Sequence, residues 1–259
     1  MTSRGPEAIT SAANALLKEL RRLSQDSHGY RKLGRVWLEG DHLCDAALQR
    51  GVKPQVAVFS QSLWDEQGSR WSGQAGREVV VADALFAGIS ALESPARMGF
   101  VIAAPERPVL DPQAATVILD RLQDAGNVGS ILRSAAAFGF HQVLAMKGTA
   151  AVWSPKVLRA AMGAHFGLSL IESAESHELE QLQVPCIATS SHAGDFLHAA
   201  RLPWPCAWML GHEGQGLDPA LAQRARLSVR IPQPGGEESL NVAAAAAICL
   251  FASAAARAA

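Results

Sequence analysis

Three stretches in the second half of the chain combine glycine with polar side chains that could act on a ligand. Asn127 and Arg133 lie in the first stretch, Glu213 in the second, and Ser239 and Asn241 in the third. Each stretch follows a short apolar run typical of a strand and leads into residues with helical spacing. Because ligands bind beyond the carboxyl ends of strands in open parallel sheets, we expect these side chains to converge on one site.

Each of these residues also has a purely structural interpretation. Asn127 could cap its helix, and Ser239 or Asn241 could cap the last helix of the chain. Arg133 could be a surface residue with a buried stem, and Glu213 an ordinary residue of a solvated loop. No GxGxxG motif follows a first strand and no GxxxxGK[ST] motif occurs in the sequence, so a nucleotide-phosphate cradle is not supported.

Composition limits the class of protein. The chain has 259 residues, is 49% hydrophobic and carries a formal net charge of −1, so it can bury a large core but has no global basic field. Its four cysteines are scattered, with no CxxC pair and no His/Cys cluster at metal-ligand spacing, so we expect reduced cysteines and no metal. The sequence shows no N-terminal hydrophobic leader, and the Ala-rich run 242–256 is too short and too weakly apolar to span a bilayer. A cytoplasmic protein with no membrane partner is the expectation.

The first half of the chain predicts a small α/β unit. Strands are expected at 36–38, 56–59, 79–81 and 100–104, and helices at 12–23, 41–50, around Leu63 and at 83–91. Prolines between 105 and 112 then interrupt the pattern. We therefore predict one domain over 1–107 and a second over 108–259.

The second half alternates strands and helices. Strands are expected at 116–119, 142–145, 167–170, 186–189, 206–210 and 227–231, and helices at 127–138, 155–161, 176–182, 219–224 and from Asn241 onward. Strands separated by helices imply a parallel sheet with right-handed crossovers.

A basic arm lies near the N-terminus. It consists of Arg21, Arg22, Arg31, Lys32 and Arg35. Such a run is either a solvated face or a patch that contacts RNA phosphates, and the sequence alone leaves both open. With a net charge near zero, any RNA-binding surface must be local.

Taken together, the three loops resemble the SpoU (TrmH-like) RNA 2′-O-ribose methyltransferases of the SPOUT class. The matching segments are 124–129 through Arg133, 210–214, Ile231-Pro232, and 238–242. Segment 154–164 also resembles the family, with Ala161 where serine is usual. The resemblance covers residues 111–256.

The first half is similar, more loosely, to the substrate-binding domain of this family, which resembles ribosomal L30e-type proteins. The similarity rests on Trp37-Leu38-Glu39-Gly40 and on the strand spacing. Together with segment 154–166, it indicates the branch that modifies ribosomal RNA, with large-subunit (23S) rRNA as the expected substrate.

The resemblance implies an α/β fold with a parallel sheet and a deep trefoil knot, a homodimer, and methyl transfer from S-adenosylmethionine to a ribose 2′-hydroxyl. The cofactor is held in this family largely by backbone atoms, which here implies Thr189, Gly211, Ile231, Pro232 and Leu240.

The resemblance also implies roles for the polar residues. Arg133 matches the family's catalytic helper. Because a guanidinium stays protonated, we expect it to clamp a phosphate and stabilise developing oxyanion charge. Asn127 would orient Arg133 or the ribose, and Glu213 would position the arginine or accept a hydrogen bond from the substrate. Ser239 and Asn241 would line the methyl-transfer pocket.

Other functions stay open at this point. A tRNA ribose methyltransferase is the nearest enzymatic alternative, and an antibiotic-resistance rRNA methyltransferase has a similar architecture. A catalytically silent RNA-binding or ribosome-assembly factor is the non-enzymatic alternative. Loss of Arg133, Glu213 or Asn241 would favour the silent factor, and the sequence retains all three.

Overall fold

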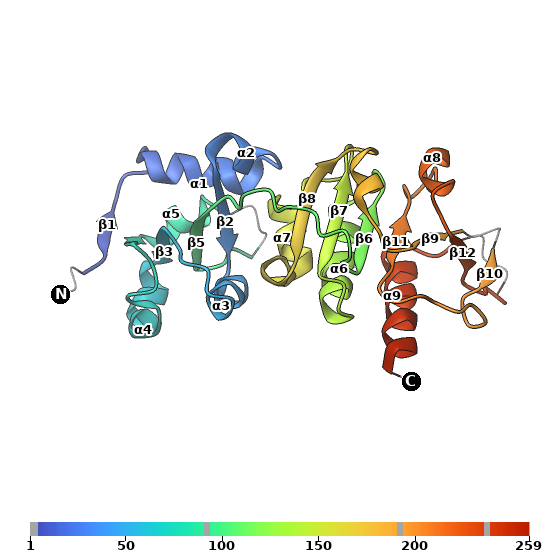
Figure 1. The fold of residues 1–259 in the computed structure, drawn as a ribbon. Coiled ribbons are helices and arrows are strands. Elements are labelled where there is room, and N and C mark those ends of the chain that lie inside the picture. Colours follow the sequence, from blue (N-terminus) through green and yellow to red (C-terminus); the bar gives the residue numbers. More distant parts are fainter. Residues whose placement is uncertain (1–4, 91–93, 191–193, 236–238, 259) are drawn as a thin grey trace. The chain divides into compact units, whose positions relative to one another are not determined.

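The computed structural model describes residues 5–90, 94–190, 194–235 and 239–258 (Figure 1). Contacts divide the chain into two compact units. The first comprises Met1–Glu106 and Trp153–Phe166, and the second Arg107–Val152 and Gly167–Ala259. The segment Trp153–Phe166, which the sequence assigns to the domain 108–259, therefore packs with the first unit. Its helix α7 (Pro155–Ala161) contacts a helix and a strand of that unit, α1 (Ala15–Gln25) and β2 (Arg35–Glu39).

The first unit contains a mixed five-stranded sheet in the order β1-β4-β3-β5-β2. Its remaining strands are β1 (Glu7–Ile9), β3 (Val56–Ser60), β4 (Arg77–Val81) and β5 (Met98–Ala103). β4 pairs in parallel with β1 and β3, whereas β5 runs antiparallel to both β3 and β2. The helices are α2 (Gly29–Leu33), α3 (Asp41–Gln49), α4 (Gln61–Trp71) and α5 (Asp83–Ala87).

Helix α1 shows why these elements form. Asn14 caps its first turn, with the side-chain oxygen accepting the N–H of Leu16 at 2.9 Å. Leu16, Leu20 and Leu23 recur at helical spacing and are buried. The apolar stripe therefore packs inward while the basic residues of the helix stay at the surface.

The second unit contains a seven-stranded sheet in which every pairing is parallel, in the order β10-β12-β9-β11-β6-β7-β8. The strands are β6 (Thr116–Leu119), β7 (Gln142–Met146), β8 (Ser169–Ala174), β9 (Cys186–Thr189), β10 (Asp195–Phe196), β11 (Ala207–Leu210) and β12 (Leu227–Arg230). The predicted parallel sheet is confirmed. Its central strands β6, β7 and β11 are buried along their whole length, as the apolar runs predict.

Among the described residues, the second unit has the α-helices α6 (Ala125–Ala137), α8 (Pro219–Ala222) and α9 (Val242–Ala258). Helices α6 and α9 lie side by side, and the rings of Phe138 and Phe251 meet edge-on with centroids 5.8 Å apart. The helix predicted at 176–182 is only a 3₁₀ turn, Glu178–Gln181. In the sheet, β7 lies on one side of β6 and β11 lies on the other, so the chain changes direction across the sheet at β6. This reversal is the switch point at which parallel sheets bind ligands.

Candidate active site

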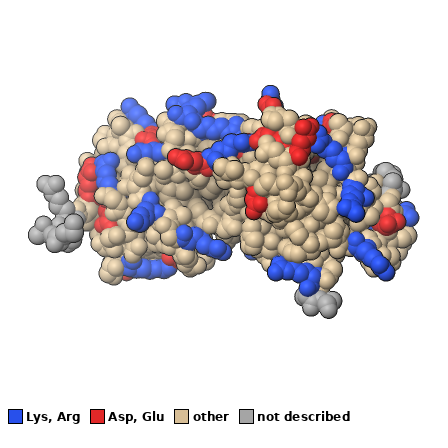
Figure 2. All heavy atoms as spheres, viewed as in Figure 1, with Lys and Arg blue, Asp and Glu red and all other residues tan. Residues whose placement is uncertain are grey.

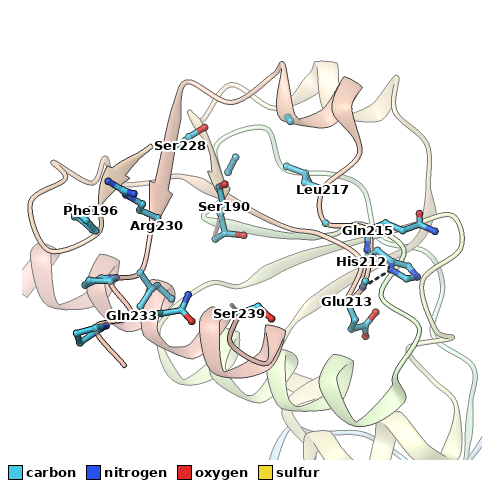
Figure 3. Close-up of a pocket in the computed structure, with 18 residues that line it drawn as sticks. Ser190, Phe196, His212, Glu213, Gln215, Leu217, Ser228, Arg230, Gln233 and Ser239 are labelled. Atoms are coloured by element: carbon cyan, nitrogen blue, oxygen red, sulfur yellow. Dashed lines mark hydrogen bonds between the residues drawn. The ribbon is translucent and has the colours of Figure 1, made fainter. Parts of the chain in front are cut away.

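An inner cavity of about 330 Å³ lies at the carboxyl ends of β9, β11 and β12 and reaches the start of α9. Thr189, Gly211, Ile231 and Leu240 line it, as do Glu213, Ser239 and Asn241, so the second and third loops meet there. An outer cavity of about 1550 Å³ adjoins the inner one and shares several of its wall residues (Figure 3). Pro232 lines the outer cavity.

Gly211 shows how closely the backbone is packed at the inner cavity. A Cβ atom at this position would lie closer than 3.0 Å to backbone atoms of Gly216 and Leu217. Only glycine allows the loop to fold back on itself here. The loop thus presents backbone groups to the cavity, which suits a ligand read by amides and carbonyls rather than by charge.

A chain of hydrogen bonds joins the three loops. The amide nitrogen of Asn241 donates to the side-chain oxygen of Asn127 at 2.9 Å. The Asn127 amide nitrogen donates in turn to Oε1 of Glu213 at 3.3 Å. Asn127 therefore contacts Glu213, which is 86 positions away in the sequence, and Asn241, which is 114 positions away. The predicted convergence of these three residues is observed.

The two asparagines differ in their structural roles. Asp124, not Asn127, caps α6, because its Oδ1 accepts the N–H of Asn127 at 2.7 Å. The amide of Asn127 is thereby left for the contacts described above. Asn241 caps α9, with Oδ1 accepting the N–H groups of Ala243 and Ala244, and it contacts Asn127 as well. Asn241 can therefore be a helix cap and a residue of the site at the same time.

Glu213 is a hydrogen-bond acceptor held by the first loop. Its carboxylate accepts backbone N–H groups of Gln123 and Asp124 at 3.4 and 3.2 Å. Burial raises the pKa of Glu213. Its own backbone N–H, the Asn127 amide and the N–H groups of Asp124 and Gln123 together outweigh burial, so the pKa lies below its usual value of 4.5. The group is charged at neutral pH and accepts rather than donates.

Arg133 is not part of the wall of either cavity. It is exposed on α6, lines neither cavity, and makes no side-chain hydrogen bond or ion pair within the described part of the chain. Ser239 is also exposed, and it lines both cavities. Gly236 and Glu238, which belong to the third predicted loop, lie outside the described residues. The structure thus brings Asn127, Glu213 and Asn241 together, and the role of Arg133 stays a prediction.

Sequence reasoning missed Asp120, at the end of β6. This buried carboxylate pairs with Arg121 through two contacts of 2.7 and 2.9 Å and accepts the N–H of Asp218 at 2.7 Å. Arg121 also donates to the side chain of Gln215 at 3.3 Å. Asp120 and Arg121 therefore fasten the part of the loop that follows Glu213. An acid directly after an apolar strand was the available signal.

His212 was missed as well. Its Nδ1 accepts the backbone N–H groups of Gly214 and Gln215 at 3.0 and 3.2 Å, which closes the turn that presents Glu213 (Figure 3). The imidazole acts here as a capping acceptor, in the manner of an Asx turn. A histidine flanked by glycines gave no periodic signal for this role.

The basic arm lies in the first unit, where Figure 2 shows lysine and arginine side chains gathered over α1 and α2. Several of its members are engaged within the unit. Arg21 donates to the carbonyl oxygens of Gly88 and Ala12, and Arg35 pairs with Glu19 at 3.0 Å. Lys32 pairs with Asp26 at 3.4 Å, and the Arg31 guanidinium lies over the Tyr30 ring. Arg22 is exposed.

Within the described residues, no group of three His, Cys, Asp or Glu side chains could hold a metal ion. No described helix has the length and apolarity needed to cross a membrane. All four cysteines are free, and three of them are buried. Burial raises the pKa of the Cys206 thiol to about 11 and that of Cys249 to about 12.

Comparison with known proteins identifies the class. Residues 114–251 match the SpoU rRNA Methylase family. A tRNA/rRNA methyltransferase of Synechocystis sp., described as uncharacterized, is 32% identical over 94% of this chain and 92% of its own length. The 23S rRNA guanosine 2′-O-methyltransferase RlmP of Bacillus subtilis is 28% identical over 94% of this chain and 97% of its own length.

Solved structures agree. An rRNA methyltransferase from Sinorhizobium meliloti with bound AdoMet (S-adenosylmethionine) superimposes with a TM-score of 0.83 at 26% identity, covering 95% of this chain and 97% of that one. A putative RNA methyltransferase of the TrmH family from Porphyromonas gingivalis gives a TM-score of 0.80 at 30% identity, covering 93% and 97%.

These relatives place the protein among the RNA methyltransferases. More specifically, the chain belongs to the SpoU rRNA Methylase family. The predicted family, the enzyme class and the use of S-adenosylmethionine are confirmed.

Proposed function

We propose that this protein transfers the methyl group of S-adenosylmethionine to a ribose 2′-hydroxyl of RNA, with large-subunit (23S) rRNA as its substrate. One observation carries the proposal: the inner cavity lies between loops that the Asn241–Asn127–Glu213 chain ties together. The name of the B. subtilis relative, which covers nearly the whole chain, supports the substrate.

The inner cavity fits the cofactor. Gly211 leaves backbone groups at the wall, and Ile231 and Leu240 add apolar surface for a flat adenosine. Thr189 borders the same space, with its hydroxyl donating to the Met209 carbonyl at 3.2 Å, and Pro232 lines the adjoining outer cavity. When bound, S-adenosylmethionine supplies a methyl group already activated on a sulfonium. The residues of the chain must therefore place and polarise the nucleophile.

Arg133 and the amide chain divide that task. The guanidinium of Arg133, exposed and without an acid partner in the described chain, clamps an RNA phosphate and stabilises oxyanion charge as the hydroxyl loses its proton. Asn127 and Asn241 orient the ribose, and the Glu213 carboxylate fixes the amide of Asn127. Ser239 lines the path between the two cavities.

The surface of α9 supports a homodimer. Ile248 and Phe251 on this helix are 40% and 58% exposed, although both are large and apolar. The Ala-rich helix also permits a close backbone approach by a second copy. A second copy of the chain covers this face. The substitution Phe251→Glu should shift the mass measured by light scattering from dimer to monomer, whereas Val109→Glu, at an isolated exposed valine, should not.

Two finer features complete the proposal. The second unit carries the deep trefoil knot of its family, and the first unit is the L30e-like domain that binds the RNA through Arg21, Arg22, Arg31, Lys32 and Arg35. Arg22 is exposed and makes no side-chain hydrogen bond or ion pair within the described residues, so it is the clearest phosphate contact of the five. The protein acts in the cytoplasm.

Ribose-methylation mapping of total RNA with and without the gene tests the function. One methylation signal in the large-subunit rRNA should disappear on deletion and return when the gene is restored. A lost signal in a tRNA would move the substrate to the tRNA branch. An unchanged map of all RNA would contradict the proposal.

A further inference from the structure

The outer cavity has a wall that the cofactor does not explain. β10 pairs with β12 so that Phe196 lies opposite Arg230. The Arg230 guanidinium carbon is 4.0 Å from the centroid of the Phe196 ring. The His198 ring also stacks on Phe196, with centroids 5.7 Å apart and planes inclined by 24°. Three planar groups therefore form one platform at the edge of the sheet, which we call the Phe196 platform.

The platform has unused binding capacity. Phe196 is 40% exposed, which is high for a large apolar side chain. The Nε atom of Arg230 and Oε1 of Gln233 are buried and have no hydrogen-bond partner within the described residues. Both residues line the outer cavity. Asp195 is exposed beside Phe196 but forms no ion pair with Arg230 within the described residues. Because buried polar atoms are normally satisfied, a donor and an acceptor left open in one cavity indicate a ligand.

The position of the platform points to the substrate. Figure 3 shows Phe196 and Arg230 at one end of the outer cavity and His212, Glu213 and Gln215 at the other. Ile231 and Ser239 belong to both cavities, so the outer space opens directly onto the proposed cofactor site. At about 1550 Å³ against about 330 Å³, it has room for a second molecule.

We propose that the Phe196 platform is a nucleobase subsite that stacks an unpaired base of the RNA substrate, at the far end of the outer cavity from Glu213. Single-stranded bases stack on aromatic rings and guanidinium planes and are read at their edges by hydrogen bonds. Phe196 and Arg230 supply the stacking surface. The guanidinium of Arg230 and the amide of Gln233, which both line the outer cavity, supply a donor and an acceptor for a base edge once their side chains turn toward it. This inference rests on the proposed function for the identity of its RNA.

Steady-state kinetics on large-subunit rRNA tests the platform. Phe196→Leu should raise KM for RNA by roughly 5- to 150-fold, the range expected for one lost stacking contact, and Phe196→Trp should restore it. Arg230→Gln should also raise KM. The matched control is Arg226→Gln, which removes an exposed arginine that lines neither cavity and should leave KM unchanged.

Cofactor binding must be measured in parallel by calorimetry. We expect Phe196→Leu and Arg230→Gln to bind S-adenosylmethionine as the wild type does. An unchanged KM for RNA would overturn the subsite. A loss of cofactor affinity equal to the rise in KM would overturn it as well, because the wall would then belong to the cofactor.

Photocrosslinking of the wild-type protein to 4-thiouridine-substituted rRNA fragments keeps the test independent of the variants and of turnover. The peptide containing Phe196 and His198 should carry a crosslink. Crosslinks confined to other peptides would overturn the inference even if methyl transfer is found. A crosslink there without any methyl transfer would instead retain the subsite and contradict the proposed function.

Discussion

The side chain of Asn241 performs two tasks at once: its oxygen caps α9, and its nitrogen donates to Asn127 Oδ1 at 2.9 Å. The last helix is thereby tied to the first loop of the site, across 114 positions of sequence. The amide nitrogen of Asn127 donates to the Glu213 carboxylate, so its amide oxygen is left to accept from Asn241. This single relationship joins the stability of α9 to the geometry of the proposed methyl-transfer site.

Substitutions at Asn241 should separate the two tasks. Asn241→Ser keeps a good capping group but loses the amide donor, so stability should change by only a few tenths of a kcal/mol while methyl transfer falls roughly 10-fold. Asn241→Ala loses both and should also destabilise the protein by about 1 kcal/mol. Urea unfolding and single-turnover assays measure these effects. A serine variant with full activity would show that the Asn127 contact is dispensable.

Glu213 should make stability depend on pH in a defined direction. Hydrogen bonds hold its pKa below the usual 4.5, so its contribution is complete above that value and is lost as pH falls through the folded pKa. The free energy of unfolding of the wild type relative to Glu213→Gln should be constant above about pH 5.5 and decrease below about pH 4.5. Urea titrations at a series of pH values test it. If the stability advantage of the wild type over Glu213→Gln instead grew as the pH fell, the pKa of Glu213 in the folded protein would be raised.

Gly211→Ala should damage the inner cavity. The added methyl group meets the Gly216–Leu217 backbone, so the loop must move, at a cost of roughly 1–3 kcal/mol. The affinity for S-adenosylmethionine should fall at least about 10-fold by calorimetry. Gly214→Ala is the matched control in the same loop, because its Cβ would come no closer than 3.9 Å to another group. Equal cofactor affinity in the two variants would refute the close-packing argument.

Arg133 is predicted to act on the substrate and not on the cofactor. Arg133→Lys keeps the charge but loses the planar fork, so kcat should fall roughly 100-fold. The dissociation constant of S-adenosylmethionine should stay unchanged, because Arg133 lines neither cavity. A pH–rate profile completes the comparison. Near-full activity with an unaltered profile would count against the clamp.

Much of the second unit could be predicted because its strands are buried on both faces. The limits of β6, Thr116–Leu119, and of β9, Cys186–Thr189, coincide with their apolar runs. Helix α7 was also predicted with its observed bounds, but the unit it packs against was not. An amphipathic pattern states that one face is buried and not which neighbour buries it.

The short and mixed features escaped prediction for a different reason. β10 has two residues, too few for any periodicity, yet it places Phe196 beside Arg230. Asp120 follows a strand like many surface acids, and only the fold shows that it is buried with Arg121 and the N–H of Asp218. The sequence also offers Asn127 as the cap of α6, but the structure has Asp124 in that position. Both residue types are good caps, so the sequence alone does not decide between them. Local patterns predict elements, whereas these contacts depend on residues distant in the chain.

Transfer of labelled methyl groups from S-adenosylmethionine to large-subunit rRNA lacking this modification tests the central claim most directly. After the purified protein has acted, the RNA is digested to nucleosides and the labelled product is identified by mass spectrometry. The account predicts one 2′-O-methylated nucleoside, formed by the wild type and strongly reduced for Arg133→Lys. Label on a base, or no transfer to rRNA under conditions in which the cofactor binds, would contradict it.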